Sequence, residues 1–324
     1  MTQRENVLAM LKGEKPDGIV NGWQCFSLVF DQLLMTVAPA HPGATVVDPW
    51  GVTLSWEEGQ PGPMPSEEHL VCPDVTKWRE CVKALDIAHM DFDWEPSFGQ
   101  MAAARAEGKF AVAFMPIGNF ELLHNLMGFE NALVGFLDEP EAMQELIDYI
   151  VDFRMAYMSH LVNTMKPDAV LVHDDWGSKN SMLISPQVFR EFLKPGYARM
   201  YQYMKENGII VIHHGDSYLE PIVKDMEEIG VDIWQGALPQ NDIAKLQKEL
   251  PGHMLFMGGI DAGIVDRKEC DEAVIRREVR RACESYMPGG KFIPCMTYGG
   301  PGAIFPGVDD IIYDEVERFG KEYF

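Results

Sequence analysis

Short apolar runs in this chain end in side chains that can bind a metal ion or move protons. The groups are His173-Asp-Asp175 after the run 169–172, His213-His-Gly-Asp216 after 209–212, Asp261 after 254–257, and Cys295-Met-Thr-Tyr298 after 292–294. Imidazole and thiolate ligands suit zinc, and carboxylates act as acids, bases or partners of a liganding histidine. Because several runs end in this way, the sequence predicts one site supplied by several strands.

The adjacent acids Asp174 and Asp175 are the strongest candidates for catalysis. Two carboxylates that directly follow a buried strand are costly unless they are paired or used. We expect one to orient a histidine and the other to bind substrate or act as an acid. The alternative is a pair that caps a helix or braces a loop.

His214 and Cys295 are the predicted zinc ligands, because they are borderline-soft donors. Successive strand residues face opposite sides of a sheet, so His213 and His214 are not expected to bind the same ion. We assign His213 a catalytic role and Tyr298 the role of a donor to a substrate oxygen. Each of these side chains could instead be structural. The candidates for the remaining ligand position are His213, Asp174, Asp175, Glu121 and Asp216.

A substrate slot is predicted from large side chains near these groups. The substrate-binding candidates are Trp23, Gln24, Phe120, Glu121 and Trp176. Aromatic side chains are more often ordinary core residues, and that alternative applies to each of them.

The elements that must position these groups are parallel strands alternating with helices. From residue 109 the pattern predicts strands at 109–115, 169–172, 209–212, 231–234, 254–257 and 291–295. Residues 18–25 read as a further strand, and an eighth near 45–47 or within 80–90 would close a barrel. We therefore predict an α/β fold: a single (β/α)8 TIM-type barrel over residues 1–324, with an N-terminal helical segment. Strand ends in such a barrel open onto one mouth.

Composition narrows the class of protein. The net charge of −23 argues against nucleic acid or an anionic membrane as a partner. No apolar stretch approaches the roughly 20 residues that span a bilayer, and the N-terminus lacks a signal-peptide core, so we expect a cytoplasmic protein. The six cysteines are scattered and are expected to be reduced. The oligomeric state stays open, a homodimer included.

Four segments resemble the uroporphyrinogen decarboxylase superfamily, and most closely its corrinoid-dependent methyltransferases. Residues 4–17 resemble the family's N-terminal helix and turn, and 48–51 its D-x-x-G segment. Residues 173–177, followed by Ser185-Pro186 and Lys194-Pro195, form the most specific match. Ser185-Pro186 also predicts a helix start, with a capping serine and a proline in the first turn. Residues 209–216 lie where metal-binding members carry H-x-C-G. The resemblance implies a TIM-type barrel with its site at the C-terminal mouth.

The resemblance also indicates which branch of the superfamily fits. The decarboxylase meets its carboxylate-rich substrate with an arginine-rich first loop, whereas this chain has no arginine between Arg4 and Arg79. Members that methylate a thiol carry His-x-Cys, which is altered here because His214 stands at the cysteine position. The chain therefore looks like members that move a methyl group from a donor, such as a methoxylated aromatic, to the cob(I)alamin of a separate corrinoid protein, with a metal ion, expected to be zinc, or an acid assisting at the leaving oxygen. The alternatives are a methylcobalamin:thiol methyltransferase, a decarboxylase of a small substrate, and a non-catalytic binding module.

Overall fold

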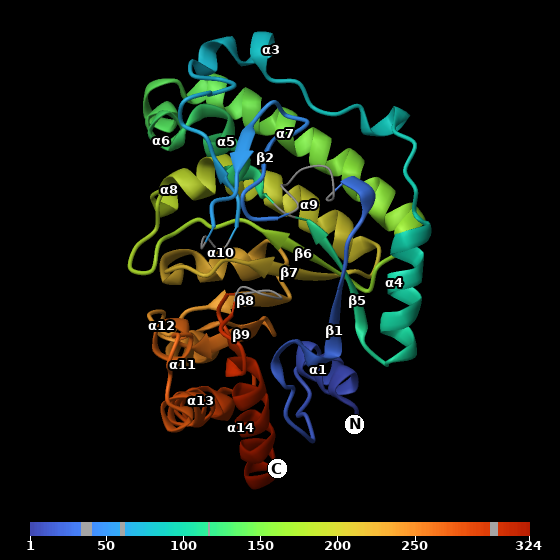
Figure 1. The fold of residues 1–324 in the computed structure, drawn as a ribbon, viewed down its shortest axis with the longest axis vertical. Helices are drawn as coiled ribbons and strands as arrows, with labels where there is room; N and C mark the ends of the chain where they lie inside the picture. Colours follow the sequence, from blue (N-terminus) through green and yellow to red (C-terminus); the bar gives the residue numbers. More distant parts are fainter. Residues whose placement is uncertain (34–40, 59–61, 116, 299–303) are drawn as a thin grey trace.

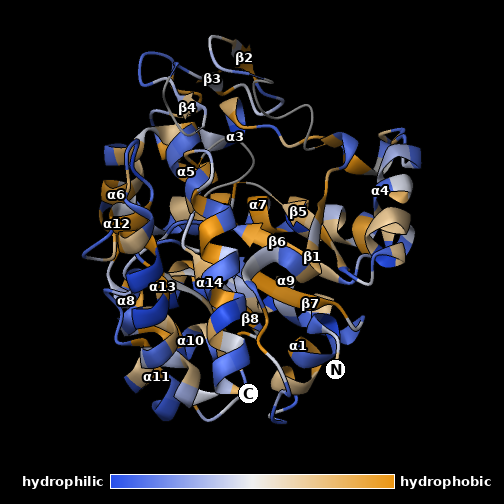
Figure 2. Ribbon diagram, turned by 60° about the horizontal axis from the view of Figure 1, so that its bottom comes forward, coloured by the Kyte–Doolittle hydropathy of each residue, from blue (hydrophilic) through white to orange (hydrophobic). Residues whose placement is uncertain are grey.

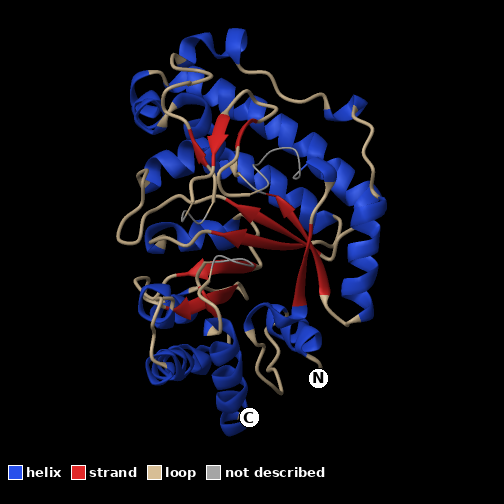
Figure 3. Cartoon of the chain, in the orientation of Figure 1, coloured by secondary structure: helices blue, strands red, loops and turns tan. Residues whose placement is uncertain are grey.

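A computed structural model describes residues 1–33, 41–58, 62–115, 117–298 and 304–324. Its centre is a curled, seven-stranded parallel sheet with the order β1-β5-β6-β7-β8-β9-β10, surrounded by helices (Figure 1, Figure 3). The strands are β1 (Phe26–Val29), β5 (Phe110–Met115), β6 (Ala169–His173), β7 (Ile210–His214), β8 (Ile233–Ala237), β9 (Leu255–Ile260) and β10 (Phe292–Met296). The predicted α/β fold of the TIM-barrel type is confirmed.

Helices alternate with the strands and cover the outer face of the sheet. They are α1 (Gln3–Leu11), α3 (Trp78–Cys81), α4 (Glu95–Ala106), α5 (Asn119–Met127), α6 (Phe129–Asp138), α7 (Pro140–His160), α8 (Pro186–Val188), α9 (Lys194–Glu206), α10 (Val223–Glu228), α11 (Ile243–Glu249), α12 (Ala262–Val265), α13 (Glu272–Tyr286) and α14 (Val308–Tyr323). The predicted start at Ser185-Pro186 is confirmed, because the Ser185 hydroxyl accepts a hydrogen bond from Val188 N at 3.1 Å. Among the described residues no helix is long and apolar enough to cross a membrane.

The strands are apolar on both faces, which explains their continuous apolar sequence. Alternate residues such as Val112, Leu171 and Ile212 face inward and pack with residues of α1. Their neighbours, such as Val170 and Val211, face outward and pack beneath the helices. Figure 2 shows β6 and β7 in orange at the centre, with blue residues on the surrounding helices. The position of a polar residue in this alternation therefore decides whether it faces the barrel interior or the helices.

Helix α1 closes the end of the barrel where the strands begin. Arg4 donates to the Lys109 carbonyl oxygen and forms an ion pair with Asp168, both at 3.0 Å. Asp168 also accepts a hydrogen bond from Ala111 N at 2.9 Å. Since residues 109 and 168 directly precede β5 and β6, these contacts identify the end opposite the predicted mouth.

The first strand differs from its prediction. Residues 18–25 do not form a strand: Gly22–Cys25 is a 3-10 turn, and β1 follows it. Gly22 has φ +52°, and a Cβ there would lie 3.0 Å from the Tyr313 ring and 3.5 Å from the Pro294 carbonyl oxygen. The turn therefore lies against β10 at the open side of the sheet, at a place where only glycine fits without strain.

The predicted eighth strand does not join the barrel sheet. Thr45–Val47 is β2, and it pairs antiparallel with β3 (Thr53–Ser55), which pairs with β4 (Met64–Pro65) in a separate sheet. Residues 80–90 contain the end of α3 and a 3-10 turn at Ile87–His89, and they form no strand. The β-branched run Thr45-Val-Val47 suits a small exposed sheet as well as a barrel strand, so the residue types alone do not separate the two.

Residues 42–75 carry too many large apolar groups for a solvated linker, and the sequence predicts that they form an excursion over the barrel mouth. The described part packs on α5 and α7: the Trp50 ring lies 4.9 Å from Phe153, and Trp78, just beyond it, lies 5.1 Å from Tyr149. Cys72 N also donates to the Leu126 carbonyl oxygen at 2.8 Å. The segment is thus part of the folded body, as its large apolar residues predict.

Candidate active site

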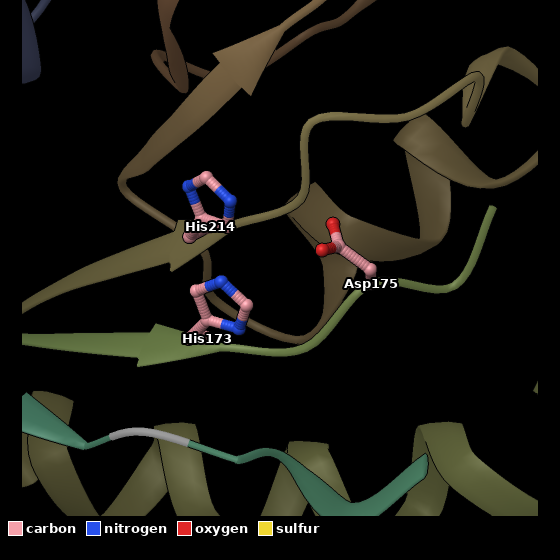
Figure 4. A group of neighbouring side chains, drawn as sticks. All are labelled: His173, Asp175 and His214. Carbon is pink, nitrogen blue, oxygen red and sulfur yellow. The ribbon is translucent and has the colours of Figure 1, made fainter. Parts of the chain in front are cut away.

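Three side chains meet at the carboxyl ends of two adjacent strands. His173 ends β6, His214 ends β7, and Asp175 lies in the loop after β6 (Figure 4). One potential ligand atom from each lies within 4.8 Å of the others. We call these three residues the His-Asp-His cluster. Because it lies at the C-terminal end of the strands, it occupies the place where TIM barrels do their chemistry.

His213 and His214 face opposite sides of the sheet, as predicted from strand alternation. His214 stacks on His173, with ring centroids 4.4 Å apart. His213 faces the helices, where its ring stacks on Trp176 at 4.0 Å and its Nδ1 lies 2.7 Å from the Tyr201 hydroxyl. His213 has no exposed surface, so the role predicted for it in catalysis would require access that this packing does not give.

Gln235 on β8 fixes the orientation of His214. Its side-chain amide donates to the Thr297 carbonyl oxygen at 3.4 Å, which leaves its Oε1 as the atom that contacts His214 Nδ1. His214 therefore carries its proton on Nδ1 and presents Nε2 as a free acceptor. This arrangement is typical of a metal-binding histidine whose second nitrogen is held by a neighbour.

Glu121 on α5 performs the same task for His173. Its Oε2 lies 3.1 Å from His173 Nδ1. Burial by itself would lower the pKa of His173, but the Glu121 carboxylate outweighs it and raises the pKa to about 10. Burial likewise opposes ionisation of Glu121, and His173 lowers its pKa to about 2. Glu121 was predicted to bind substrate, but in this geometry its carboxylate is engaged by His173.

Two further carboxylates crowd the same space. Asp175 accepts a hydrogen bond from Asp216 N at 3.0 Å. Burial, followed by the charges of Asp216 and Glu121, raises the pKa of Asp175 well above its usual range despite attraction to His173. Burial and Glu121 also raise the pKa of Asp216 to about 6. Burial is the main cause of both raised pKa values, and the neighbouring carboxylates add to it; a bound cation would favour the ionised forms.

The neighbouring Asp174 has a different role from Asp175. It is fully buried and accepts hydrogen bonds from Phe120 N at 3.0 Å, Glu121 N at 2.9 Å and Trp176 Nε1 at 2.7 Å, and also from the Tyr197 hydroxyl. These bonds hold the first turn of α5, from which Glu121 reaches His173. The alternative of a helix-bracing aspartate therefore fits Asp174 better than the predicted catalytic role, because its carboxylate is fully buried and engaged by these four hydrogen bonds.

The donor set of the His-Asp-His cluster fits a zinc ion. Two imidazole nitrogens and one carboxylate match catalytic zinc sites that keep a fourth position open. Cys295, the second predicted ligand, does not belong to the group found among the described residues. It lies in the apolar cluster that fills the barrel interior, where burial raises the pKa of its thiol. The structure therefore brings His214 together with His173 and Asp175 rather than with Cys295.

The predicted substrate-binding residues are spread over three places. Trp23 and Gln24 precede β1, and Gln24 contacts Gln3 of α1 at 3.1 Å, so they lie towards the closed end and their prediction as mouth residues is wrong. The cause is the misplaced first strand. Phe120 and Trp176 have no exposed surface and pack beneath the helices, so neither lines an accessible slot.

A different aromatic row leads to the cluster. The ring of Phe114 on β5 lies edge-on to His173 at 6.4 Å, and Phe30, which is 39% exposed, lies 6.1 Å from Phe114. Sequence reasoning singled out neither ring, and it did not select His173 as a ligand. The inward alternation of 110, 112 and 114, and of 169, 171 and 173, was the available signal.

Tyr298 lies beside the carboxylates rather than on the cluster itself. Its hydroxyl donates to Asp266 Oδ2 at 3.0 Å. Burial, together with this bond, raises the pKa of Tyr298 to about 12, so it is a neutral phenol. Its predicted role as a donor to a substrate oxygen would require it to exchange Asp266 for the substrate.

Comparison with known proteins identifies the family. Uroporphyrinogen decarboxylases from two strains of Thermus thermophilus are each 29% identical to this chain over 124 residues, a match that covers 38% of this chain and 33% of theirs. The structure of a methyltransferase from Methanosarcina mazei superposes with a TM-score of 0.71 at 16% identity, covering 98% of this chain and 99% of that one. At that identity the superposition establishes the shared fold. Residues 44–301 match the uroporphyrinogen decarboxylase family, and the chain therefore belongs to it.

Proposed function

We propose that this protein is a methyltransferase that moves a methyl group from a methoxylated aromatic to the cob(I)alamin of a separate corrinoid protein. The observation that carries the proposal is the His-Asp-His cluster at the C-terminal end of the barrel, with both histidines held through Nδ1. The fold shared with a protein described as a methyltransferase agrees with it.

His173, Asp175 and His214 would hold a zinc ion, and the ion would supply Lewis acidity at the ether oxygen. Cleavage of the ether needs this assistance because an unassisted phenoxide is a poor leaving group. Gln235 would keep His214 in the tautomer that presents Nε2, and Glu121 would hold Nδ1 of His173, whose Nε2 must give up its proton for the ion to bind.

The remaining residues would position the donor and manage its proton. The Phe114 ring offers an apolar face for the substrate ring next to His173. In the reaction the bond between the methyl carbon and the ether oxygen breaks, its electron pair stays on oxygen, and the methyl carbon bonds to cobalt on the partner. Asp216, whose pKa burial and Glu121 raise to about 6, would be the carboxyl group that supplies a proton to the phenoxide.

The alternatives make different demands on the site. A decarboxylase acting on a carboxylate-rich substrate needs cationic donors, whereas carboxylates surround this cluster. A methylcobalamin:thiol methyltransferase would use the same ion to activate a thiol. Methyl transfer measured in both directions separates the candidates. We expect methoxyarenes to methylate the corrinoid. We expect no consumption of a free thiol in the presence of methylcobalamin and no release of carbon dioxide.

The test is a panel of methoxyarenes incubated with the protein and cob(I)alamin, free or on a corrinoid protein. Methylcobalamin formation that requires the intact cluster supports the proposal, with Cys270→Ala as a control away from the cluster. Thiol methylation or decarboxylation without methyl transfer from any methoxyarene would overturn it.

A further inference from the structure

The turn between β5 and α5 contains a strained residue. Ile117 has φ +56°, in the left-handed region that a β-branched residue rarely adopts. Such a conformation persists only where the surrounding structure holds it. Ile117 is followed by Gly118 and then by the first turn of α5, which carries Glu121 to His173. The contacts that hold Ile117 therefore also determine where α5 begins.

Arg154 on α7 makes such a contact. Its guanidinium group donates a hydrogen bond to the Ile117 carbonyl oxygen. The arginine is only 6% exposed, and its Nε has no hydrogen-bond partner among the residues that the structure describes. Burial of a cationic side chain costs free energy, and here that side chain contacts the backbone of a strained turn. Arg154 is therefore committed to this turn and not to solvent.

The chain that follows Ile117 has little freedom to shift. A Cβ on Gly118 would lie 2.1 Å from the Asp174 Cβ, so the backbone lies directly against that side chain. Asn119 N donates to the Tyr197 hydroxyl at 2.9 Å, and the next two N–H groups donate to the Asp174 carboxylate. A change of backbone conformation at Ile117 would displace these three N–H groups together.

We propose that Arg154 is a positioning residue for the His-Asp-His cluster. By holding Ile117 in the left-handed conformation, it fixes the first turn of α5, and this turn places the Glu121 carboxylate against His173. The inference rests on the proposed function for the metal ion and adds a residue that acts on the site through the backbone. Partners of a liganding histidine change metal affinity about 10–100-fold, and Arg154 orients one such partner.

Amide hydrogen exchange in the metal-free protein measures the positioning itself. Arg154→Met should speed exchange of the Phe120 and Glu121 N–H groups at least about tenfold, because the first turn of α5 opens more readily once Ile117 is released. Tyr157→Phe is the matched control. It removes a buried hydrogen bond to Asp31 one helical turn further along α7, and it should leave exchange at these two amides unchanged.

Zinc affinity, measured by competition with a chromogenic chelator, tests the consequence at the cluster. Arg154→Met should weaken zinc binding about five- to tenfold, whereas Tyr157→Phe should weaken it by about twofold or less. Ile117→Gly makes the left-handed conformation available without strain, so in that background Arg154→Met should weaken zinc binding by no more than about twofold. This coupling distinguishes a hold on Ile117 from a general loss of stability.

Unchanged exchange in folded Arg154→Met, or the same loss of zinc affinity with and without Ile117→Gly, would overturn the inference. If Arg154→Met does not fold, Arg154→Lys is measured in both backgrounds against the same criterion, because lysine keeps a donor but lacks the planar fork. A wild type that binds no zinc would contradict the proposed function alone, since exchange in the metal-free protein still decides whether Arg154 holds the first turn of α5.

Discussion

The imidazole rings of His173 and His214 lie face to face, 4.4 Å apart at their centroids and inclined by only 14°. They meet because β6 and β7 are parallel neighbours in which these two residues are register partners. With Nδ1 of each ring engaged by Glu121 or Gln235, the atoms left to bind a ligand are the two Nε2 nitrogens. Two imidazole rings held in this way, next to Asp175, form the His-Asp-His cluster.

Replacement of His214 should change the zinc content, whereas replacement of His213 should change the stability. His214→Ala should reduce bound zinc from about one ion per chain to a small fraction, because a ligand is lost. His213→Ala should retain zinc but lower the free energy of unfolding by about 2–4 kcal/mol, because a fully buried ring stacked on Trp176 leaves a cavity. Elemental analysis and chemical denaturation measure the two effects. Equal zinc content in both variants would refute the assignment.

Gln235→Leu should weaken zinc binding about 10–100-fold while leaving the ligands in place, because His214 Nδ1 loses its partner. Competition with a chromogenic chelator measures the affinity. Gln247→Leu is the matched control, since Gln247 is a similarly buried glutamine on α11. If both variants bind zinc as the wild type does, Gln235 does not orient the ligand.

Cys295→Ala should leave the zinc content unchanged, because the thiol lies in the apolar interior and not in the cluster. Its loss should cost only about 1 kcal/mol of stability, as expected for a small buried hydrophobic group. Elemental analysis beside His214→Ala decides the matter. If Cys295→Ala instead loses its zinc, Cys295 is a ligand together with His214, as predicted from the sequence.

Asp174→Asn should destabilise the protein by about 2–4 kcal/mol, since an amide group would face the donors that the carboxylate now accepts. It should also slow methyl transfer, because the first turn of α5 carries Glu121 to His173. Asp225→Asn provides the comparison: this aspartate is also buried, but it binds Arg190 and Lys194. Similar loss of activity in both variants, at matched stability, would reduce Asp174 to a general structural role.

The contribution of Asp168 should depend on pH in a defined direction. Burial opposes its ionisation, but hydrogen bonds from Ala111 N and Arg4 and the charge of Arg105 lower its pKa below the unfolded value. A lowered folded pKa stabilises the protein above the unfolded pKa of about 4, and this stability is lost as pH falls through the folded pKa.

Asp168→Asn should therefore cost about 1–3 kcal/mol at pH 7 and progressively less below about pH 4. Urea denaturation of both proteins across this range gives the difference in the free energy of unfolding. A difference that is constant with pH would show that the ion pair with Arg4 contributes nothing through its charge.

Periodicity in the sequence predicts the barrel from 109 onward, because buried parallel strands leave unbroken apolar runs such as 169–172. It fails at the N-terminus for a physical reason. This segment carries apolar residues because Val20 and Cys25 pack in the barrel interior with α1, and Gly22, with its positive φ, turns the chain beside β10 before β1 begins. Burial, and not strand geometry, produces the pattern there.

In the site, too, strand periodicity predicts the direction of residues within a strand but not of those beyond its end. Strand alternation correctly separates His214 from His213, because both lie within β7. Asp174 and Asp175 follow the end of β6, where no period fixes direction, and only the structure shows that one braces α5 and the other faces the histidines. The depth of Cys295 in the barrel depends on the stagger between distant strands, which spacing along one chain does not encode.

The most direct measurement of the central claim is single-turnover methyl transfer from 2-methoxyphenol, isotopically labelled in its methyl group, to cob(I)alamin on a corrinoid protein. The zinc-loaded wild type should place the label on cobalt and release the unmethylated phenol in equal amount, whereas His214→Ala should transfer at least about 100-fold more slowly while remaining folded. Transfer by His214→Ala at the wild-type rate, or label that never reaches cobalt from this or any other methoxyarene, would contradict the account.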